Sequence, residues 1–193
     1  TSEAYGIYLE GGTAGTTTIT NTHNKFTTDG IIKVSSEDDA KAIFISGDSV
    51  GTITNSGRIE ATGGGDYSLG IHIDGDFTGD IDNYDDGSQI IVNNNGSGVA
   101  KAIVVEGIFT GDLNNNIIDV DALVEDATGI EIETVAAAST VTNQADLHVN
   151  TNEGDATGVF VETNEGIIDN DNGFIGVYSN FNFAISLLRR HII

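Results

Sequence analysis

A short motif, [AS]-x-[GA]-[IV]-x-[IVL], recurs six times along this chain of 193 residues. Its copies begin at Ala4, Ala40, Ser68, Ala100, Ala127 and Ala156, at intervals of 27 to 36 residues. Repeats of this length are typical of folds in which each unit contacts only its neighbours. The repeat therefore constrains the architecture more strongly than any single residue does.

Two more apolar segments follow the motif in each repeat, such as Ile19-Thr20-Asn21 and Ile32-Lys33-Val34 in the first. Apolar and polar residues alternate in these segments, and β-branched residues are frequent, which predicts strands. Gly, Asn, Asp and Ser lie between the segments, as turns require. No stretch shows a sustained helical period, so three strands per repeat are expected.

Three short strands cannot cover their own apolar side, so each repeat must stack on the next. We therefore predict an all-β, right-handed parallel β-solenoid (β-helix), with about six three-strand coils of roughly 28 residues. Residues 1–193 would form a single domain. Two columns of the first strand should point inward: Ile7, Ile43, Ile71, Ile103, Ile130 and Val159, and beside them Leu9, Ile45, Ile73, Val105, Ile132 and Val161.

The composition excludes several partners. The formal net charge is −23, with seven Lys and Arg residues, so neither a phosphate backbone nor an anionic membrane is an expected partner. No apolar run reaches the roughly 18 residues of a membrane span, so we expect no membrane insertion by this segment. The chain has no Cys and no Pro, so disulfides are excluded and nothing interrupts central strands.

The two ends of the sequence favour a segment or a repeating subunit of a longer structure. Thr1-Ser2-Glu3 lacks the features of a signal peptide, and Ala184-Ile185-Ser186-Leu187 resembles the start of a seventh repeat. One interpretation is an arbitrary boundary within a longer chain. The other is that uncapped ends stack on further copies and build a filament.

Two aligned positions suggest a metal site and a structural ladder. Acidic residues after the first strand would form a vertical edge at which calcium is a possible ligand, although EF-hand spacing is absent; a solvated acidic edge is the alternative. The edge residues are Glu10, Asp74, Glu106, Glu133 and Glu162, with Ser46 in the second repeat. Asparagines closing the second strand should form a structural ladder: Asn21, Asn55, Asn83, Asn115, Asn143 and Asn170.

A third aligned position lies on the outer side of the first strand and is relatively apolar. Exposed apolar surface can mark an interaction site, and ordinary cross-strand pairing is the alternative. The candidate interaction face consists of Tyr8, Phe44, His72, Val104 and Phe160, with Glu131 in the fifth repeat.

Catalysis finds little support in the sequence, so no catalytic residue or bound cofactor is expected. The four histidines, His23, His72, His148 and His191, fall in different registers and do not have metal-ligand spacing. No Ser-His-Asp arrangement can be assembled from the aligned positions. Carboxylates are too numerous for one acid–base pair to be chosen.

The chain resembles the passenger regions of Gram-negative autotransporters. Ala127-Thr128-Gly129-Ile130-Glu131-Ile132 and Thr52-Ile53-Thr54-Asn55-Ser56-Gly57-Arg58-Ile59 carry the resemblance most clearly. The resemblance implies secretion to the bacterial cell surface and a role in adhesion, aggregation or display, with no catalytic motif to transfer. The terminal β-barrel translocator of that family is not found in this sequence.

Two functions from different classes follow. The first is an extracellular structural and adhesive solenoid, a stalk or filament segment that self-associates end to end or side by side and contacts a ligand on a host or neighbouring cell. The second is a polysaccharide-active β-helix enzyme, a lyase or hydrolase, which would need a groove of clustered carboxylates flanked by long loops.

Overall fold

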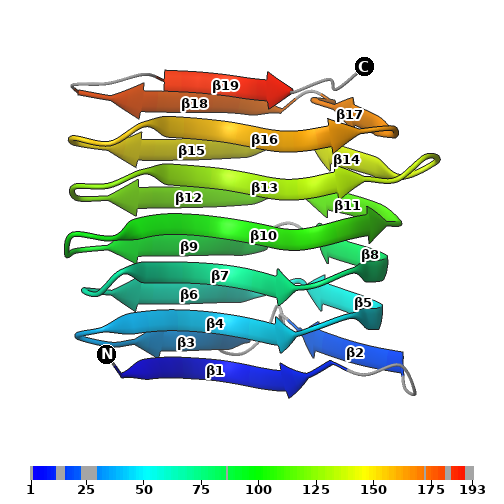
Figure 1. The fold of residues 1–193 in the computed structure, drawn as a ribbon, viewed down its shortest axis with the longest axis horizontal. Coiled ribbons are helices and arrows are strands. Elements are labelled where there is room, and N and C mark those ends of the chain that lie inside the picture. The colour runs from blue at the N-terminus through cyan, green and yellow to red at the C-terminus, as the bar shows by residue number, and fades with distance from the viewer. Residues whose placement is uncertain are drawn as a thin grey trace.

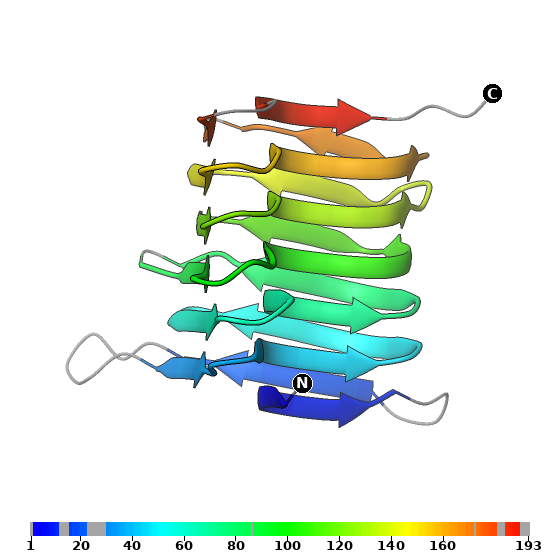
Figure 2. The same ribbon diagram turned by 60° about the vertical axis from the view of Figure 1, so that its left-hand side comes forward.

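The chain winds into a stack of parallel coils, in a computed structural model that describes residues 2–11, 16–22, 30–85, 87–171, 173–180 and 184–189. The described residues form nineteen strands and no helix. Each coil has three strands, one on each side of the stack, and the winding is right-handed (Figure 1). The two ends of the chain lie at opposite ends of the stack (Figure 2). The predicted solenoid is therefore confirmed.

Three faces run along the stack, named here by the order of their strands in a coil. The first face contains β1 (Glu3–Glu10), β4 (Asp39–Ser46), β7 (Tyr67–Asp74), β10 (Val99–Thr110), β13 (Ala127–Val135), β16 (Ala156–Asn164) and β19 (Ala184–Arg189). The second face contains β2 (Thr16–Asn21), β5 (Ser49–Asn55), β8 (Phe77–Asn83), β11 (Asp112–Asn115), β14 (Thr140–Asn143) and β17 (Ile167–Asp169).

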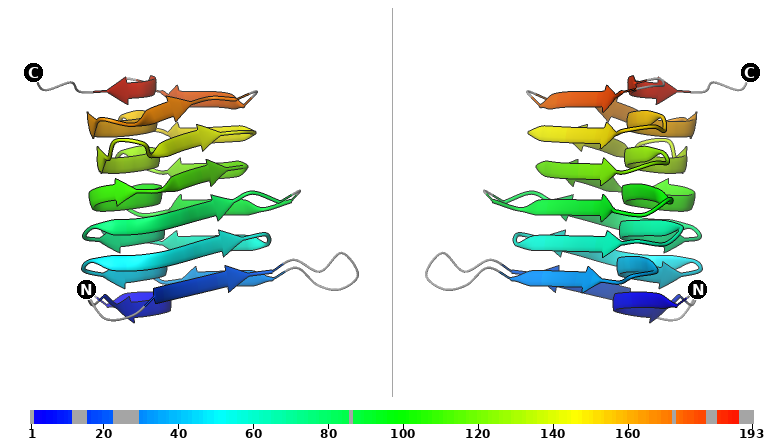
Figure 3. Two further views of the ribbon diagram at one scale, coloured as in Figure 1. Left: turned by 90° about the vertical axis from the view of Figure 1, so that its right-hand side faces the viewer. Right: turned by 90° about the vertical axis from the view of Figure 1, so that its left-hand side faces the viewer.

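The third face is a separate six-stranded sheet. The strands of this third face are β3 (Ile31–Ser35), β6 (Arg58–Gly63), β9 (Gln89–Asn94), β12 (Ile117–Ala122), β15 (Asp146–Thr151) and β18 (Phe174–Ser179). The first two faces form one sheet of thirteen strands, because the long strand β10 pairs with β8 as well as with its first-face neighbours. Figure 3 shows that the strands of successive coils lie directly above one another. Every strand pair is parallel, as the repeat predicts.

The register between coils agrees with the sequence alignment of the repeats. On the first face Ile43 pairs with Ile7 and with Ile71, and on the second face Ile53 pairs with Ile19 and with Ile81. Side chains at both predicted inward columns are buried in the middle coils, where Ile71 has an exposed fraction of 0%. The core is thus a continuous set of aliphatic columns enclosed by three faces.

The small residue at the third motif position also faces this core. A methyl group built on Gly70 would lie 2.8 Å from Ile90 Cγ2 and 3.2 Å from Val92 Cγ2, both on the third face. In the same column Ala42 and Ala102 are completely buried. The same methyl group would lie 2.5 Å from the carbonyl oxygen of Ala102 in the next coil. Only a small residue therefore suits this column, and at Gly70 even Ala requires a local shift, which explains the restricted choice at this position.

Candidate functional site

The asparagine column forms an unbroken chain of side-chain hydrogen bonds inside the corner between the second and third faces. Each Nδ2 donates to the Oδ1 of the asparagine one coil further along, at 2.7 to 2.9 Å. The same amides also donate to backbone carbonyls, as from Asn83 to Ile117 at 3.1 Å. The central members are shielded from solvent, with Asn83 and Asn115 both at 0% exposure.

This corner holds the coils together. Buried amides must be hydrogen-bonded because each unpaired group costs roughly 1–3 kcal/mol, and here every amide is used between coils. The ladder therefore fixes register and stabilises the turn, which agrees with the structural role expected from the sequence.

The acidic edge follows the end of the first face, with Glu10, Ser46 and Asp74 aligned by the strand register. Glu106 turns back across the first face, where its Oε1 lies 2.9 Å from Nε2 of His72. Within the described ranges, no group of three or more Asp, Glu or His side chains is arranged to hold a metal ion. Calcium binding at Glu10, Asp74, Glu106, Glu133 and Glu162 stays a prediction.

Aspartates in the neighbouring turns accept backbone hydrogen bonds from the next coil. Asp48 Oδ1 accepts from the amide of Asp76 at 3.0 Å, Asp76 Oδ1 accepts from Ile108 at 2.8 Å, and Asp80 Oδ1 accepts from Asp112 at 3.0 Å. A carboxylate that accepts a backbone hydrogen bond satisfies a turn amide that the sheet leaves unpaired. Part of the acidic composition therefore serves the stacking of coils.

The outer row of the first face is aligned as predicted, but its centre is not exposed. Phe44, His72 and Val104 have exposed fractions of 8%, 7% and 2%, whereas Tyr8 in the terminal coil is 52% exposed and Phe160 is half-buried. The expected contiguous exposed face is therefore wrong at its three central positions. The Lys41 side chain lies over the Phe44 ring and Glu106 contacts His72, which the strand pattern alone does not reveal.

Lys41 shows how this cover works. Its Nζ lies 4.5 Å from the centroid of the Phe44 ring, in a cation–π contact, and 3.2 Å from Glu3 Oε1. Phe44 also packs against His72, with 4.9 Å between ring centroids. Burial lowers the pKa of His72, while the nearby Glu106 carboxylate opposes this shift. At the centre of this outer row, aromatic and charged side chains pack against one another, and these contacts stabilise the first face.

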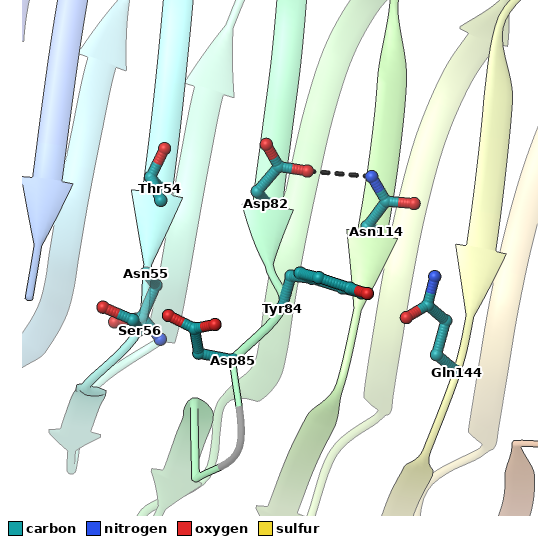
Figure 4. Close-up of a pocket in the computed structure, with 8 residues that line it drawn as sticks. All are labelled: Thr54, Asn55, Ser56, Asp82, Tyr84, Asp85, Asn114 and Gln144. Atoms are coloured by element: carbon teal, nitrogen blue, oxygen red, sulfur yellow. Dashed lines mark hydrogen bonds between the residues drawn. The ribbon is translucent and has the colours of Figure 1, made fainter. Parts of the chain in front are cut away.

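One hollow lies on the second face, beside the asparagine corner, and Figure 4 shows its side chains. Its volume is about 450 Å³, which is within the range of small-molecule sites. We call it the Tyr84 groove, and it is lined by Thr54, Asn55, Ser56, Asp82, Tyr84, Asp85, Asn114 and Gln144.

An extended turn produces this groove. Five residues separate β8 from β9, whereas two separate β5 from β6 and one separates β11 from β12. Asp85 is held against the next coil because Asn116 Nδ2 donates to its carbonyl at 2.8 Å, and within the turn the Ser88 amide donates to the same carbonyl at 2.8 Å. Tyr84 therefore projects from a fixed backbone and is 60% exposed.

The chemistry of the groove combines one aromatic ring with hydrogen-bonding groups. Asp82 Oδ1 accepts a hydrogen bond from Asn114 Nδ2 at 2.8 Å, and the Tyr84 ring extends from the end of β8 toward Asn114 and Gln144 (Figure 4). No Lys, Arg or His is among its lining residues. The groove can accept hydrogen bonds from a ligand and offer an apolar ring surface, but it offers no positive charge to an anion.

Sequence reasoning missed Tyr84 as a functional candidate. It lies in a turn insertion, outside the aligned positions in which candidates were sought. A signal existed, since an exposed aromatic residue in a loop has no packing role and such residues are enriched in binding sites. The repeated Phe-Thr-Gly-Asp at residues 77–80 and 109–112 was also missed, and its two buried phenylalanines stack with centroids 6.3 Å apart.

A carboxylate on the third face has a perturbed pKa. Burial and the neighbouring Asp121 raise the pKa of Asp119, while His148, its partner in the strand register, opposes the shift. Asp121 Oδ1 accepts a hydrogen bond from Asn150 Nδ2 at 2.9 Å. None of the lining residues of the Tyr84 groove lies on this face, so the two features are separate.

No helix in the described part of the chain is long and apolar enough to cross a bilayer. Comparisons with protein families, with curated proteins and with solved structures found no match to this chain.

Proposed function

We propose that this protein is an extracellular structural and adhesive scaffold, a rigid solenoid that self-associates end to end and displays ligand-binding side chains on its sides. The observation that carries this proposal is the in-register parallel pairing of equivalent strands from coil to coil, as between β4 and β7, because a coil that pairs with its copy within the chain has the surface to pair with a coil of a second molecule. The aliphatic columns reach the outermost described coils, where Ile7, Ile32, Ile168, Ile175 and Val177 are partly buried.

Unpaired strand edges accompany these columns. Among the described strands, β3 and β18 are the outermost members of the third face, and each has a strand neighbour on one side only. Such edges are templates for pairing with a further strand. A head-to-tail contact between copies repeats without closing and so builds a filament. A negative charge of −23 opposes side-by-side clumping while the ends associate.

The adhesive and cell-surface parts of the proposal are supported by composition and by the resemblance to autotransporter passenger regions. The chain has no cysteine, so its stability depends on hydrogen bonds between coils and on burial. These interactions are the same in oxidising and reducing surroundings. A scaffold that presents identical register positions along its length suits display of side chains at fixed spacing. This is a proposal about biological role, to be tested separately from the fold.

Sedimentation velocity and negative-stain electron microscopy over a concentration series test end-to-end association. The expected result is rods that lengthen with concentration at constant width. Ile175→Glu and Ile32→Glu, which place a charge at opposite ends, should each keep the particles short. Leu123→Glu, at a side turn where Leu123 is 47% exposed, is the matched control and should leave assembly unchanged. Short rods of constant length at all concentrations for the unmodified protein would contradict the proposal.

A further inference from the structure

We infer that the Tyr84 groove binds a neutral, hydroxyl-rich sugar, as a short stretch of a neutral oligosaccharide or polysaccharide. The inference names a ligand class for the adhesive role and rests on the proposed function only for that biological role. The site itself is defined by side chains on the second face and does not depend on filament formation.

Charge decides the class of ligand. Two carboxylates, Asp82 and Asp85, contribute to the lining, and no basic side chain does. An anionic ligand would face these carboxylates inside a molecule that already carries a net charge of −23, so acidic glycans and phosphates are disfavoured. Carboxylates and amide oxygens accept hydrogen bonds, so the ligand must be a donor of several hydrogen bonds, which neutral sugar hydroxyls are.

The aromatic ring selects a ligand with an apolar face as well. Tyr84 is 60% exposed, and among the described residues its hydroxyl has no hydrogen-bond partner. A pyranose ring has one face of C–H groups and a rim of hydroxyls, so it can pack on the Tyr84 ring while its hydroxyls reach Asp82, Asp85 and Gln144. An aromatic side chain supplies large contact area at low entropic cost.

The groove is already arranged before any ligand arrives. The hydrogen bond from Asn114 to Asp82 fixes one oxygen of this carboxylate. The bonds from Asn116 and Ser88 to its carbonyl hold Asp85, the residue next to Tyr84. A site with fixed groups loses less conformational entropy on binding than a mobile loop does. Tyr8, Tyr67 and Tyr178 are also exposed, but none of them lines this groove.

The test is a titration of the folded protein, at a concentration at which it is dispersed, with cellotriose, maltotriose, tri-N-acetylchitotriose and, as the acidic contrast, trigalacturonate. Binding is followed by amide chemical shifts and calorimetry in the presence of EDTA. We expect at least one neutral trisaccharide to bind with a Kd of about 1 mM or tighter, and to shift the amides of residues 82–85 and 114.

Variants locate the contact. Tyr84→Ala should weaken binding about tenfold or more, and Tyr84→Phe should keep most of the affinity because it keeps the ring. Tyr67→Ala removes a tyrosine of 48% exposure from the first face and should change nothing. Absence of binding by all three neutral sugars, preference for trigalacturonate, binding that requires calcium, or unchanged affinity of Tyr84→Ala would each overturn the inference. Each of these results is independent of whether rods form, so the two proposals can fail separately.

Discussion

Asn55 donates a hydrogen bond from Nδ2 to Oδ1 of Asn83 at 2.7 Å, and both side chains are at most 1% exposed. This single bond joins consecutive coils that are 28 residues apart in sequence. The same bond recurs from coil to coil along the corner, so the ladder connects distant parts of the chain by short, shielded contacts.

The first prediction concerns the centre of this ladder. Asn83→Ala should lower the free energy of unfolding by about 2–4 kcal/mol, because it removes two ladder bonds and leaves buried groups of Asn55 and Asn115 without their partner. Urea denaturation followed by circular dichroism measures the change. Asn114→Ala, next to the ladder but on the outer side, should cost less than about 1 kcal/mol; equal losses for both variants would show that the ladder has no special role.

The second prediction concerns the small residue of the repeat motif. Gly70→Leu should destabilise the protein by about 3 kcal/mol or more, because its side chain would collide with Ile90 and Val92 of the third face. Gly70→Ala should cost less than Gly70→Leu, since Ala42 and Ala102 occupy the same column in the adjacent coils, but more than nothing, since its methyl group would lie 2.5 Å from the carbonyl oxygen of Ala102. Thermal melts of both variants check this order, and a Leu variant as stable as the Ala variant would contradict the packing described.

The third prediction concerns pH. Burial lowers the pKa of His72 in the folded state below its ordinary value of 6.5, and Lys41 adds to this effect, while Glu106 and Asp74 oppose it. Below pH 6.5 the unfolded chain therefore binds more protons at this residue, so the folded state loses stability as the pH falls toward the lowered pKa. Above pH 6.5 the contribution is fully retained.

Comparison with His72→Gln isolates this effect from the general titration of carboxylates. The stability difference between the native protein and the variant should shrink between pH 7.5 and pH 5.5, as measured by urea denaturation at each pH. A difference that stays constant or grows on acidification would contradict a lowered pKa.

The fourth prediction concerns the acidic edge. Sodium chloride should raise the melting temperature, because salt screens repulsion among stacked carboxylates in a chain of net charge −23. Calcium chloride at matched ionic strength should raise it further if the edge residues Glu133 and Glu162 help to bind the ion. Equal melting temperatures in the two salts would contradict calcium binding at the edge. A melting temperature that falls when sodium chloride is added would contradict the repulsion among the carboxylates.

Much of the fold could be predicted from the sequence because the solenoid converts alignment into contact. Once Ile43 and Ile71 are aligned as equivalent residues, they must be neighbours in space, and the structure pairs them in the predicted register. The asparagine column follows from the same reasoning. The neighbours of a residue that recurs in every repeat can therefore be predicted from the sequence.

Exposure and insertions could not be predicted in the same way. Phe44 alternates with inward residues and so reads as exposed, but Lys41 lies over its ring, and this depends on side-chain conformations rather than on period. Tyr84 belongs to a turn whose length varies from coil to coil, so no aligned partner indicates its role. The candidate site arises where the chain departs from its own repeat.

Electron microscopy of the purified protein over a range of concentrations tests most directly the central claim, that copies of this solenoid associate end to end. If copies associate end to end, the expected particles are rods of constant width that lengthen with concentration and that Ile175→Glu shortens but Leu123→Glu does not. Particles of one fixed length at every concentration, with no difference between the two variants, would contradict it.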